Sequence, residues 1–327
     1  MNWRRSLALT ETFATVSAMR SLRMLHFNAV LAGMFLAAAG SAEELRVMTF
    51  NLWRGGDAGK QPLSQSAAVI RAAHADLVGF QETGGFERNG RRPNNGRLLA
   101  ELLGWHYHEQ GGSPGIASRF PLVTNTPGKH GITVRLPSGR PVWHFNVHLM
   151  HTPYQPYQLL SIPYGEAPFI KTAAEAVTEA RKARGSEIEA LLSELKPALA
   201  TGEPVFLTGD FNEPSHLDWT AKAAQAGRHP LAVPYPATAA IDAAGMQDTF
   251  RVVHPDEVAR PGITWTPLTK PSDPKDHHDR IDFVFFAGRG VTPTRCEVVG
   301  EARPAADLVV SPWPSDHRAV VGTFALK

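Results

Sequence analysis

The chain has 327 residues, 43% of them hydrophobic, and a formal net charge of +2. This apolar content is ordinary for a globular protein with a sizeable core, and the length fits one large domain or two. A single cysteine, Cys296, excludes an internal disulfide.

The first 42 residues are typical of a secretory leader. A basic start precedes an apolar run over residues 29–39 that is too short to span a bilayer, and the small residues 40–42 offer a cleavage site. A retained membrane anchor is the alternative. We therefore expect a periplasmic or secreted protein with a leader over residues 1–42 and a single domain over residues 43–327.

The excess of positive charge belongs to this leader. Residues 1–42 hold four basic residues and one acidic residue, so their removal leaves 29 basic and 30 acidic residues. A protein that grips a long polyanion mainly through its phosphates carries an excess of positive charge. The balance therefore argues against a duplex-gripping nuclease, while remaining compatible with a local basic patch.

The first predicted strands each end in a polar side chain. Residues 45–51 alternate as a strand that ends at Asn51, before a glycine-rich turn that lets the backbone bend sharply. A helix over residues 64–74 follows, and the apolar strand over residues 76–80 then leads into Glu82. Both strands thus deliver a polar group to the end of a sheet.

A hairpin follows further along the chain. Residues 132–136 and 142–149 are separated by the turn sequence Pro-Ser-Gly-Arg, and His148 lies at the end of the second strand.

The stretch over residues 151–169 has no helical or strand period and contains Tyr154, Tyr157 and Tyr164. A structureless segment of this length in a compact domain is usually a binding loop or a lid. We therefore expect these tyrosines to contact a substrate. A solvated connection to the helix predicted over residues 172–195 is the alternative.

The most informative stretch is residues 204–219. Val205 to Leu207 form a short apolar run typical of a strand buried on both faces, and Asp210 and Asn212 follow it. Residues two apart in an extended chain point to the same side. A carboxylate that can polarise a water, beside an uncharged hydrogen-bonding group, suits hydrolysis at a phosphorus centre. For this motif alone, an aspartate that only caps the next turn is the alternative, and a helix is expected over residues 215–226.

The chain closes with two predicted strands, separated from the preceding part by proline-rich surface loops. The strand over residues 281–286 carries Asp282, and the strand over residues 318–326 follows Asp316 and His317.

Collected in chain order, the polar residues at the strand ends form one recurring pattern. Read as TFNLW, GFQET, NVHL, GDFN, DRID and SDHR, these motifs resemble the endonuclease/exonuclease/phosphatase superfamily over nearly the whole chain after the leader. The resemblance implies a DNase I-like, four-layer α/β/β/α sandwich of two facing mixed β-sheets. It also implies phosphoester hydrolysis with a divalent ion, usually Mg²⁺, with Mn²⁺ or Ca²⁺ as alternatives.

Carried over residue by residue, the resemblance implies that Glu82 is the main metal ligand, with Asn51 and Asp316 beside it. A site of few oxygen ligands and several waters is one that Mg²⁺ tolerates. Asp210 would orient or deprotonate the attacking water, and Asn212 would donate a hydrogen bond to a non-bridging phosphate oxygen.

The resemblance also implies roles for two histidines. His148 would contact the scissile phosphate, and His317 would be the family's paired histidine, held by Asp282. A carboxylate on one ring nitrogen fixes the tautomer and favours the imidazolium. Whether Asp210 or His317 takes the proton stays open.

These observations predict a metal-dependent phosphoester hydrolase, acting on phosphodiesters in preference to monoesters. The expected substrate is a small molecule, a lipid headgroup or a short nucleic acid, and the expected enzyme is a monomer without an obligate protein partner. A secreted DNase I-like endonuclease is the alternative, and a binding module that kept the fold without catalysis is a remoter one.

A second motif points to different chemistry. Residues 111–115 fit the GxSxG pattern of serine hydrolases, with Ser113 as the candidate nucleophile. The residue after that nucleophile must donate its backbone N–H to the oxyanion, and Pro114 has none. The sequence therefore disfavours a serine hydrolase.

Overall fold

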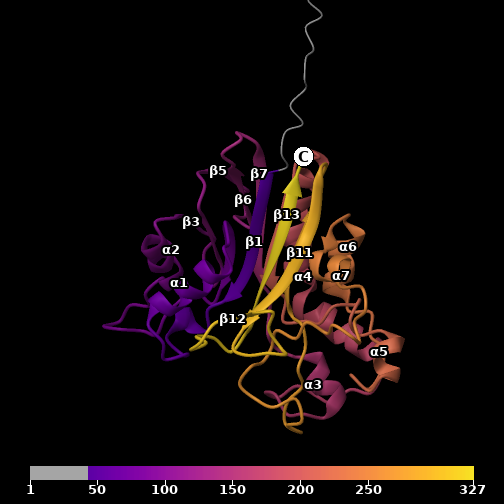
Figure 1. Ribbon diagram of the computed structural model, residues 1–327. Helices are drawn as coiled ribbons and strands as arrows, with labels where there is room; N and C mark the ends of the chain where they lie inside the picture. Colours follow the sequence, from indigo (N-terminus) through magenta and orange to yellow (C-terminus); the bar gives the residue numbers. More distant parts are fainter. Residues whose placement is uncertain (1–42) are drawn as a thin grey trace, which may run out of the picture. The chain divides into compact units, whose positions relative to one another are not determined.

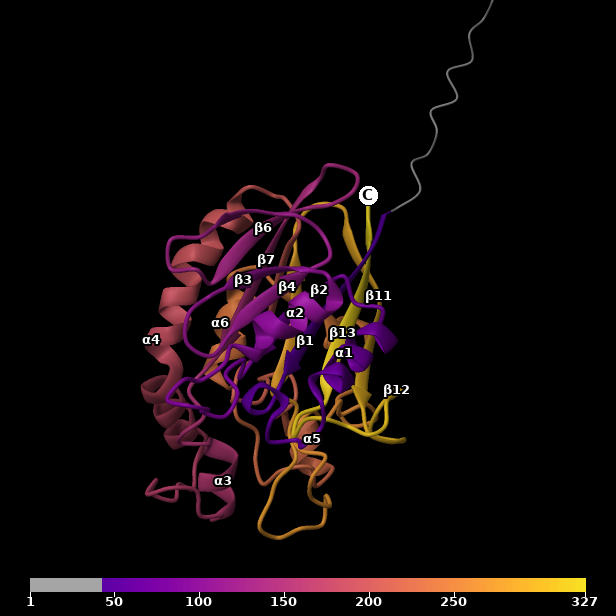
Figure 2. The same cartoon turned by 90° about the vertical axis from the view of Figure 1, so that its left-hand side faces the viewer.

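The computed structural model describes residues 43–327, so the predicted leader over residues 1–42 lies outside the described residues. Within residues 43–327 the strands form two mixed sheets, one of seven strands and one of six. The sheets face each other and helices cover their outer faces (Figure 1, Figure 2). This arrangement confirms the predicted four-layer sandwich. No helix in this part of the chain combines the length and apolarity needed to cross a membrane.

The larger sheet brings three segments of the chain to one edge. Its strands are β1 (Glu43–Asn51), β2 (Leu77–Gln81), β3 (His106–Glu109), β4 (Gly115–Ser118), β11 (Val291–Gly300), β12 (Leu308–Val309) and β13 (Ala319–Leu326), in the order β12-β11-β13-β1-β2-β4-β3. Strand β1 is parallel to β2 and antiparallel to β13. The ends of β1 and β2 therefore meet the beginning of β13, which follows His317.

The smaller sheet brings three predicted site residues to its own edge. Its strands are β5 (Leu122–Asn125), β6 (Gly131–Arg135), β7 (Pro141–His148), β8 (Val205–Asp210), β9 (Gln247–Asp248) and β10 (Asp282–Ala287), in the order β5-β6-β7-β8-β10-β9. The register places Asp210 opposite His148 on one side and opposite Asp282 on the other.

Apolar helix faces cover both sheets. Helices α1 (Leu63–Ala72) and α2 (Asn95–Leu103) pack on the larger sheet, and α4 (Ala173–Ala200) and α6 (Pro236–Ala243) pack on the smaller one. Shorter helical segments lie in the connections: η1 (Arg54–Gly56), α3 (Gln155–Leu160), α5 (Ala221–Gln225) and α7 (Thr249–Val253).

Several segments differ from the sequence prediction, which also lacks the short strands β3, β5, β9 and β12 and the helices α6 and α7. Strand β11 was not expected, and its Pro293 lies where the register with β13 shifts, a position that tolerates a missing N–H. The helix expected over residues 215–226 is confined to α5 because residues 216–219 form a turn and a bend instead. The stretch over residues 151–169 contains α3, so it is not a structureless loop.

A buried polar cluster joins the two sheets near this edge. Gln81 of β2 donates through Nε2 to Oδ1 of Asn146 of β7 at 2.7 Å, and Oγ1 of Thr208 of β8 donates to the same oxygen at 3.1 Å. Gly79 makes room for this contact, because a Cβ there would lie 2.0 Å from Thr208 Oγ1 and 2.3 Å from Asn146 Oδ1. The cluster therefore fixes how one sheet lies on the other.

We predict that Gly79→Ala destabilises the protein by about 1–3 kcal/mol, the usual effect of an added methyl group in a packed interior. Gly185→Ala is the matched control, since Gly185 lies inside α4 and an added Cβ meets nothing within 4 Å. The control is expected to stabilise the helix by about 0.5–1 kcal/mol. Urea unfolding followed by tryptophan fluorescence measures both values, and equal midpoints for the two variants would contradict the prediction.

Candidate active site

The two sheet edges together border one pocket of about 610 Å³. Much of its wall is formed by residues that the sequence singled out: Glu82, His148, Tyr164, Asp210, Asn212, Asp316 and His317. Asn51 and Asp282 are buried directly behind this wall, in hydrogen-bond contact with residues of the pocket.

Asp210 lies at the centre of these contacts. Its Oδ2 accepts a hydrogen bond from Nδ2 of Asn51 at 2.9 Å, across the two sheets. The Nε2 atoms of His148 and His317 lie 3.6 Å and 3.7 Å from the same oxygen. Oδ1 accepts from the backbone N–H of Asn212 at 2.9 Å. This carboxylate is therefore held on both oxygens, with two imidazoles facing one of them.

Asn212 reaches the pocket by a different route from the one predicted. Strand β8 ends at Asp210, and Asn212 has a φ of 47°, in the left-handed region rather than in an extended chain. Asparagine tolerates this region better than most residues. Its Nδ2 donates to the carbonyl of Leu149 at 2.9 Å, which fixes the side chain beside Asp210.

His317 and Asp282 form a buried pair. Nδ1 of His317 donates to Oδ2 of Asp282 at 3.0 Å. Burial alone would lower the pKa of His317, but the negative charges of Asp282 and Asp210 outweigh it and raise that pKa to about 10. The imidazole therefore carries a proton on both nitrogens at neutral pH, and its Nε2–H faces Asp210.

Glu82, Asn51 and Asp316 form the acidic side of the pocket. Glu82 accepts through Oε2 from the backbone N–H of Arg54 at 2.9 Å, and its Oε1 lies 3.5 Å from Nδ2 of Asn51. Oδ1 of Asp316 is buried without a hydrogen-bond partner among the described residues. Burial raises the pKa of Asp316 to about 6, and the charge of Glu82 adds to this shift while His317 opposes it.

A divalent cation fits this acidic side. An unpartnered carboxylate oxygen beside a second carboxylate is the arrangement that a bound cation stabilises, and carboxylate oxygens are the ligands that Mg²⁺ prefers. Glu82 and Asp316 would hold the ion. Asn51 directs its Nδ2 at the two carboxylates Asp210 and Glu82, and its Oδ1 accepts from the Trp53 N–H at 2.9 Å.

A second group of potential metal ligands lies beside the acidic side of the pocket. Asp210, Asp282 and His317 each offer a ligand atom within 4.8 Å of the others. His317 already donates to Asp282, and an imidazolium has no free lone pair for a metal. The protonated histidine therefore balances these two carboxylates itself, although Oδ1 of Asp282, like Oδ1 of Asp316, has no hydrogen-bond partner among the described residues. The acidic side of the pocket is the better cation site because no imidazolium is hydrogen-bonded to its carboxylates in the described residues.

Of the three tyrosines, only Tyr164 lines the pocket. Tyr154 and Tyr157 are buried, with exposed fractions of 3% and 7%. Their hydroxyls donate to Asp279 at 2.6 Å and to Asp276 at 2.5 Å. The structure therefore does not bring these two side chains into the wall of the pocket, because both point inward at the first turn of α3.

The buried tyrosines pack beneath the pocket wall. The rings of Tyr154 and Tyr157 lie 5.6 Å and 5.8 Å from that of Trp265, measured between centroids, and Trp265 lines the pocket. They support an aromatic wall that the sequence did not identify.

Other pocket residues were also missed, among them Trp53, Arg54, Arg92 and Ser113. Trp53 and Arg54 lie two and three positions after Asn51, so their closeness to the end of a strand was the available signal. The sequence pattern singles out Ser113 only as a candidate nucleophile. Its position in the pocket depends on contacts with residues distant in the chain.

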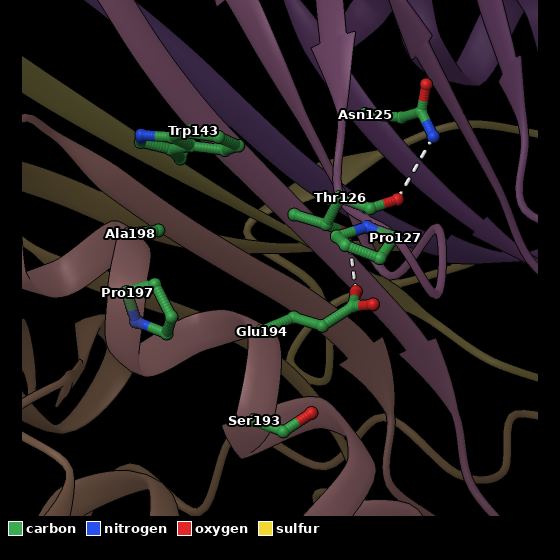
Figure 3. Close-up of a pocket in the computed structure, with 8 residues that line it drawn as sticks. All are labelled: Asn125, Thr126, Pro127, Trp143, Ser193, Glu194, Pro197 and Ala198. Atoms are coloured by element: carbon green, nitrogen blue, oxygen red, sulfur yellow. Dashed lines mark hydrogen bonds between the residues drawn. The ribbon is translucent and has the colours of Figure 1, made fainter.

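A separate pocket of about 450 Å³ lies between α4 and the end of β5. Its lining comprises Asn125, Thr126, Pro127, Trp143, Ser193, Glu194, Pro197 and Ala198 (Figure 3). The hydroxyl of Thr126 donates to the carboxylate of Glu194, so these two polar side chains of the lining are paired with each other. None of the predicted site residues lines it.

Comparisons with known proteins agree with this architecture. The sequence profile of the endonuclease/exonuclease/phosphatase family matches residues 48–317. An uncharacterized protein of Caenorhabditis elegans is 29% identical over 301 residues, covering 86% of this chain and 91% of that protein.

Solved structures show the same fold at lower sequence identity. An endonuclease/exonuclease/phosphatase from Beutenbergia cavernae is 22% identical with a TM-score of 0.54, covering 86% of this chain and 72% of that one. TDP2 from C. elegans is 16% identical with a TM-score of 0.51, covering 86% and 75% of the two chains.

We predict that the free energy of unfolding falls as the pH rises from about 7 to about 10 in metal-free buffer. The folded protein keeps the His317 proton up to a pKa of about 10, whereas the unfolded chain releases it near 6.5. The stabilisation is therefore complete below pH 6.5 and lost above pH 10. Urea unfolding across this range checks the slope.

His317→Gln is the control for this pH dependence, since it removes the titrating ring. The variant is expected to lose less stability than the wild type over the same interval. Parallel curves for the two proteins would show that His317 does not hold its proton in the folded state.

Proposed function

The chain belongs to the endonuclease/exonuclease/phosphatase family, and from its site we propose that it is a metal-dependent hydrolase of phosphodiesters. One observation carries the proposal. The Asp210 carboxylate lies between two imidazoles, while Glu82 and Asp316 form a cation site in the same pocket.

We propose that Asp210 takes the proton of the attacking water. His317 keeps its own proton at neutral pH because Asp282 and Asp210 stabilise the imidazolium, so it has no free nitrogen to accept another. As the water oxygen bonds to phosphorus, its proton passes to Oδ2 of Asp210, and the departing ester oxygen leaves with the electron pair of the broken bond and takes a proton from solvent. The raised pKa of His317 therefore supports Asp210, and not His317, as the proposed general base.

The remaining groups stabilise the charge that builds on the phosphoryl oxygens. His317 presents Nε2–H toward the pocket, and Asn212 and His148 lie beside it. Preorganised donors of this kind lower the barrier because they need no reorganisation during the reaction. A divalent cation held by Glu82 and Asp316, with Mg²⁺ as the first choice, would neutralise a phosphate oxygen.

The pocket suits a substrate with an apolar or aromatic part next to its phosphate. Trp53, Tyr164 and Trp265 line it, and the body of the chain is nearly neutral. We propose a small molecule, a lipid headgroup or a short nucleic acid. A DNase I-like endonuclease is the second candidate, favoured by the exposed Arg54 and Arg92, which line the pocket and can contact further phosphates.

The place of action and the assembly are part of the same proposal. The leader-like sequence over residues 1–42 supports export to the periplasm or the medium. The pocket is formed by one chain, which supports a monomer without an obligate protein partner.

We predict that the purified protein hydrolyses bis-p-nitrophenyl phosphate, and that EDTA abolishes this activity until Mg²⁺ is restored. Asp210→Asn is expected to lower the rate by about 10²-fold or more, the usual contribution of a general base. Asp242→Asn, the same change at an exposed carboxylate outside the pocket, is the control. Turnover in EDTA, or a rate for Asp210→Asn within a few-fold of the wild type, would refute the proposal.

We predict that the enzyme prefers small or lipid phosphodiesters to duplex DNA. Plasmid, abasic duplex, sphingomyelin and inositol phosphates with Mg²⁺ form the test panel. Because the body carries no excess positive charge, plasmid nicking is expected to be weak at ordinary salt. Strong nicking would instead establish the endonuclease.

A further inference from the structure

We propose that Ser113 is a positioning residue whose single hydroxyl holds Glu82 and His148 in their working orientations. This inference rests on the proposed function, because it gives Ser113 a role in the same site. Ser113 lies in the pocket wall and comes from the loop before β4, whereas Glu82 follows β2 and His148 ends β7.

The loop that carries Ser113 is fastened to the end of β2. The backbone N–H of Glu82 donates to Oγ of Ser113 at 3.0 Å. The carbonyl of Ser113 accepts from the backbone N–H of Thr83 at 2.9 Å and from the Thr83 hydroxyl at 2.8 Å. Three hydrogen bonds thus join Ser113 to the segment that presents Glu82.

Glu82 needs such support because its backbone is strained. Its φ of 53° lies in the left-handed region, which residues other than glycine adopt at an energetic cost of about 1–3 kcal/mol. The side chain is fixed by the N–H of Arg54, and the backbone N–H is fixed by the Ser113 hydroxyl. The hydroxyl therefore helps to keep the proposed metal ligand in the pocket.

The same hydroxyl selects the tautomer of His148. Oγ of Ser113 accepts the N–H of Glu82 and lies 2.9 Å from Nδ1 of His148, and we assign the hydroxyl proton to that nitrogen. A neutral imidazole that accepts at Nδ1 carries its proton at Nε2. Nε2 lies 3.6 Å from Oδ2 of Asp210, so the selected N–H faces the reacting groups.

The two histidines beside Asp210 are therefore held by different partners. Asp282, a carboxylate, holds His317 and stabilises its positive charge. Ser113, a neutral hydroxyl, holds His148 and orients it without adding negative charge. The ring of His317 supplies a charged hydrogen-bond donor, and the ring of His148 supplies a donor of fixed direction.

The first test needs no substrate. Nitrogen-15 NMR of the ring of His148, assigned with His148→Gln, reports its tautomer at a pH where the ring is neutral. The wild type and Ser113→Thr, which keeps the hydroxyl, are expected to show a protonated Nε2. Ser113→Ala is expected to show a mixture of tautomers. An unchanged tautomer in Ser113→Ala would overturn the inference.

The second test uses turnover of bis-p-nitrophenyl phosphate. Ser113→Ala is expected to lower kcat by roughly 10-fold to 100-fold and to raise the Mg²⁺ concentration needed for half-maximal activity, as lost support of metal ligands commonly does. Ser113→Thr, which keeps the hydroxyl, should restore most of kcat and most of the Mg²⁺ affinity. Ser138→Ala, in an exposed turn outside the pocket, is the control. Equal rates and equal Mg²⁺ requirements for Ser113→Ala and the control would overturn the inference.

The outcomes separate this inference from the proposed function. A wild-type protein without metal-dependent turnover would overturn the proposed function. In that case the NMR comparison of the His148 tautomer in the wild type and Ser113→Ala would still test this inference. Complete loss in Ser113→Ala, together with wild-type activity that resists EDTA, would identify a serine nucleophile and overturn both. Ser113→Cys, with a weaker donor of similar size, replaces Ser113→Ala if the latter does not fold.

Discussion

The structure depends on the burial of one carboxylate, that of Asp210, at the junction of two sheets. Only 1% of this residue is exposed, and a buried carboxylate is strongly unfavourable unless donors surround it. Asn51 supplies a donor from the larger sheet, and Asn212 supplies one from the turn after β8. Since these donors come from different layers, the site exists only when the two sheets meet in one relative position.

The relative position of the two sheets is set by the buried polar cluster that lies behind the pocket. Gln81 and Asn146 join the sheets through a buried hydrogen bond, and each lies within two residues of a side chain of the pocket. Gly79 allows this close approach because any side chain there would collide with the polar cluster. A buried hydrogen bond is directional, whereas apolar contact alone permits sliding. The cluster thus converts the packing of two sheets into a defined geometry at their edge.

Charge then distinguishes the two sides of the pocket. On one side, the Asp210 and Asp282 carboxylates are balanced within the protein by the His317 imidazolium. On the other, burial and the charge of Glu82 leave Asp316 with a raised pKa and an unpartnered oxygen. The protein thus supplies its own cation, the His317 imidazolium, beside Asp210, and offers oxygen ligands that fit a metal ion at Glu82 and Asp316.

The sequence by itself determined most polar residues at the strand ends, because apolar runs and the polar residues after them are local patterns. The family and the four-layer fold followed from the resemblance of the motifs that these residues form. The sequence did not reveal β11, the left-handed turn at Asn212 or the inward rotation of Tyr154 and Tyr157. Only the tertiary structure decided these, since they depend on partners far away in the chain, such as Asp279 for Tyr154. Ser113 shows the same limit: its contact with His148 spans 35 residues, and no local pattern reports which ring nitrogen a hydroxyl will meet.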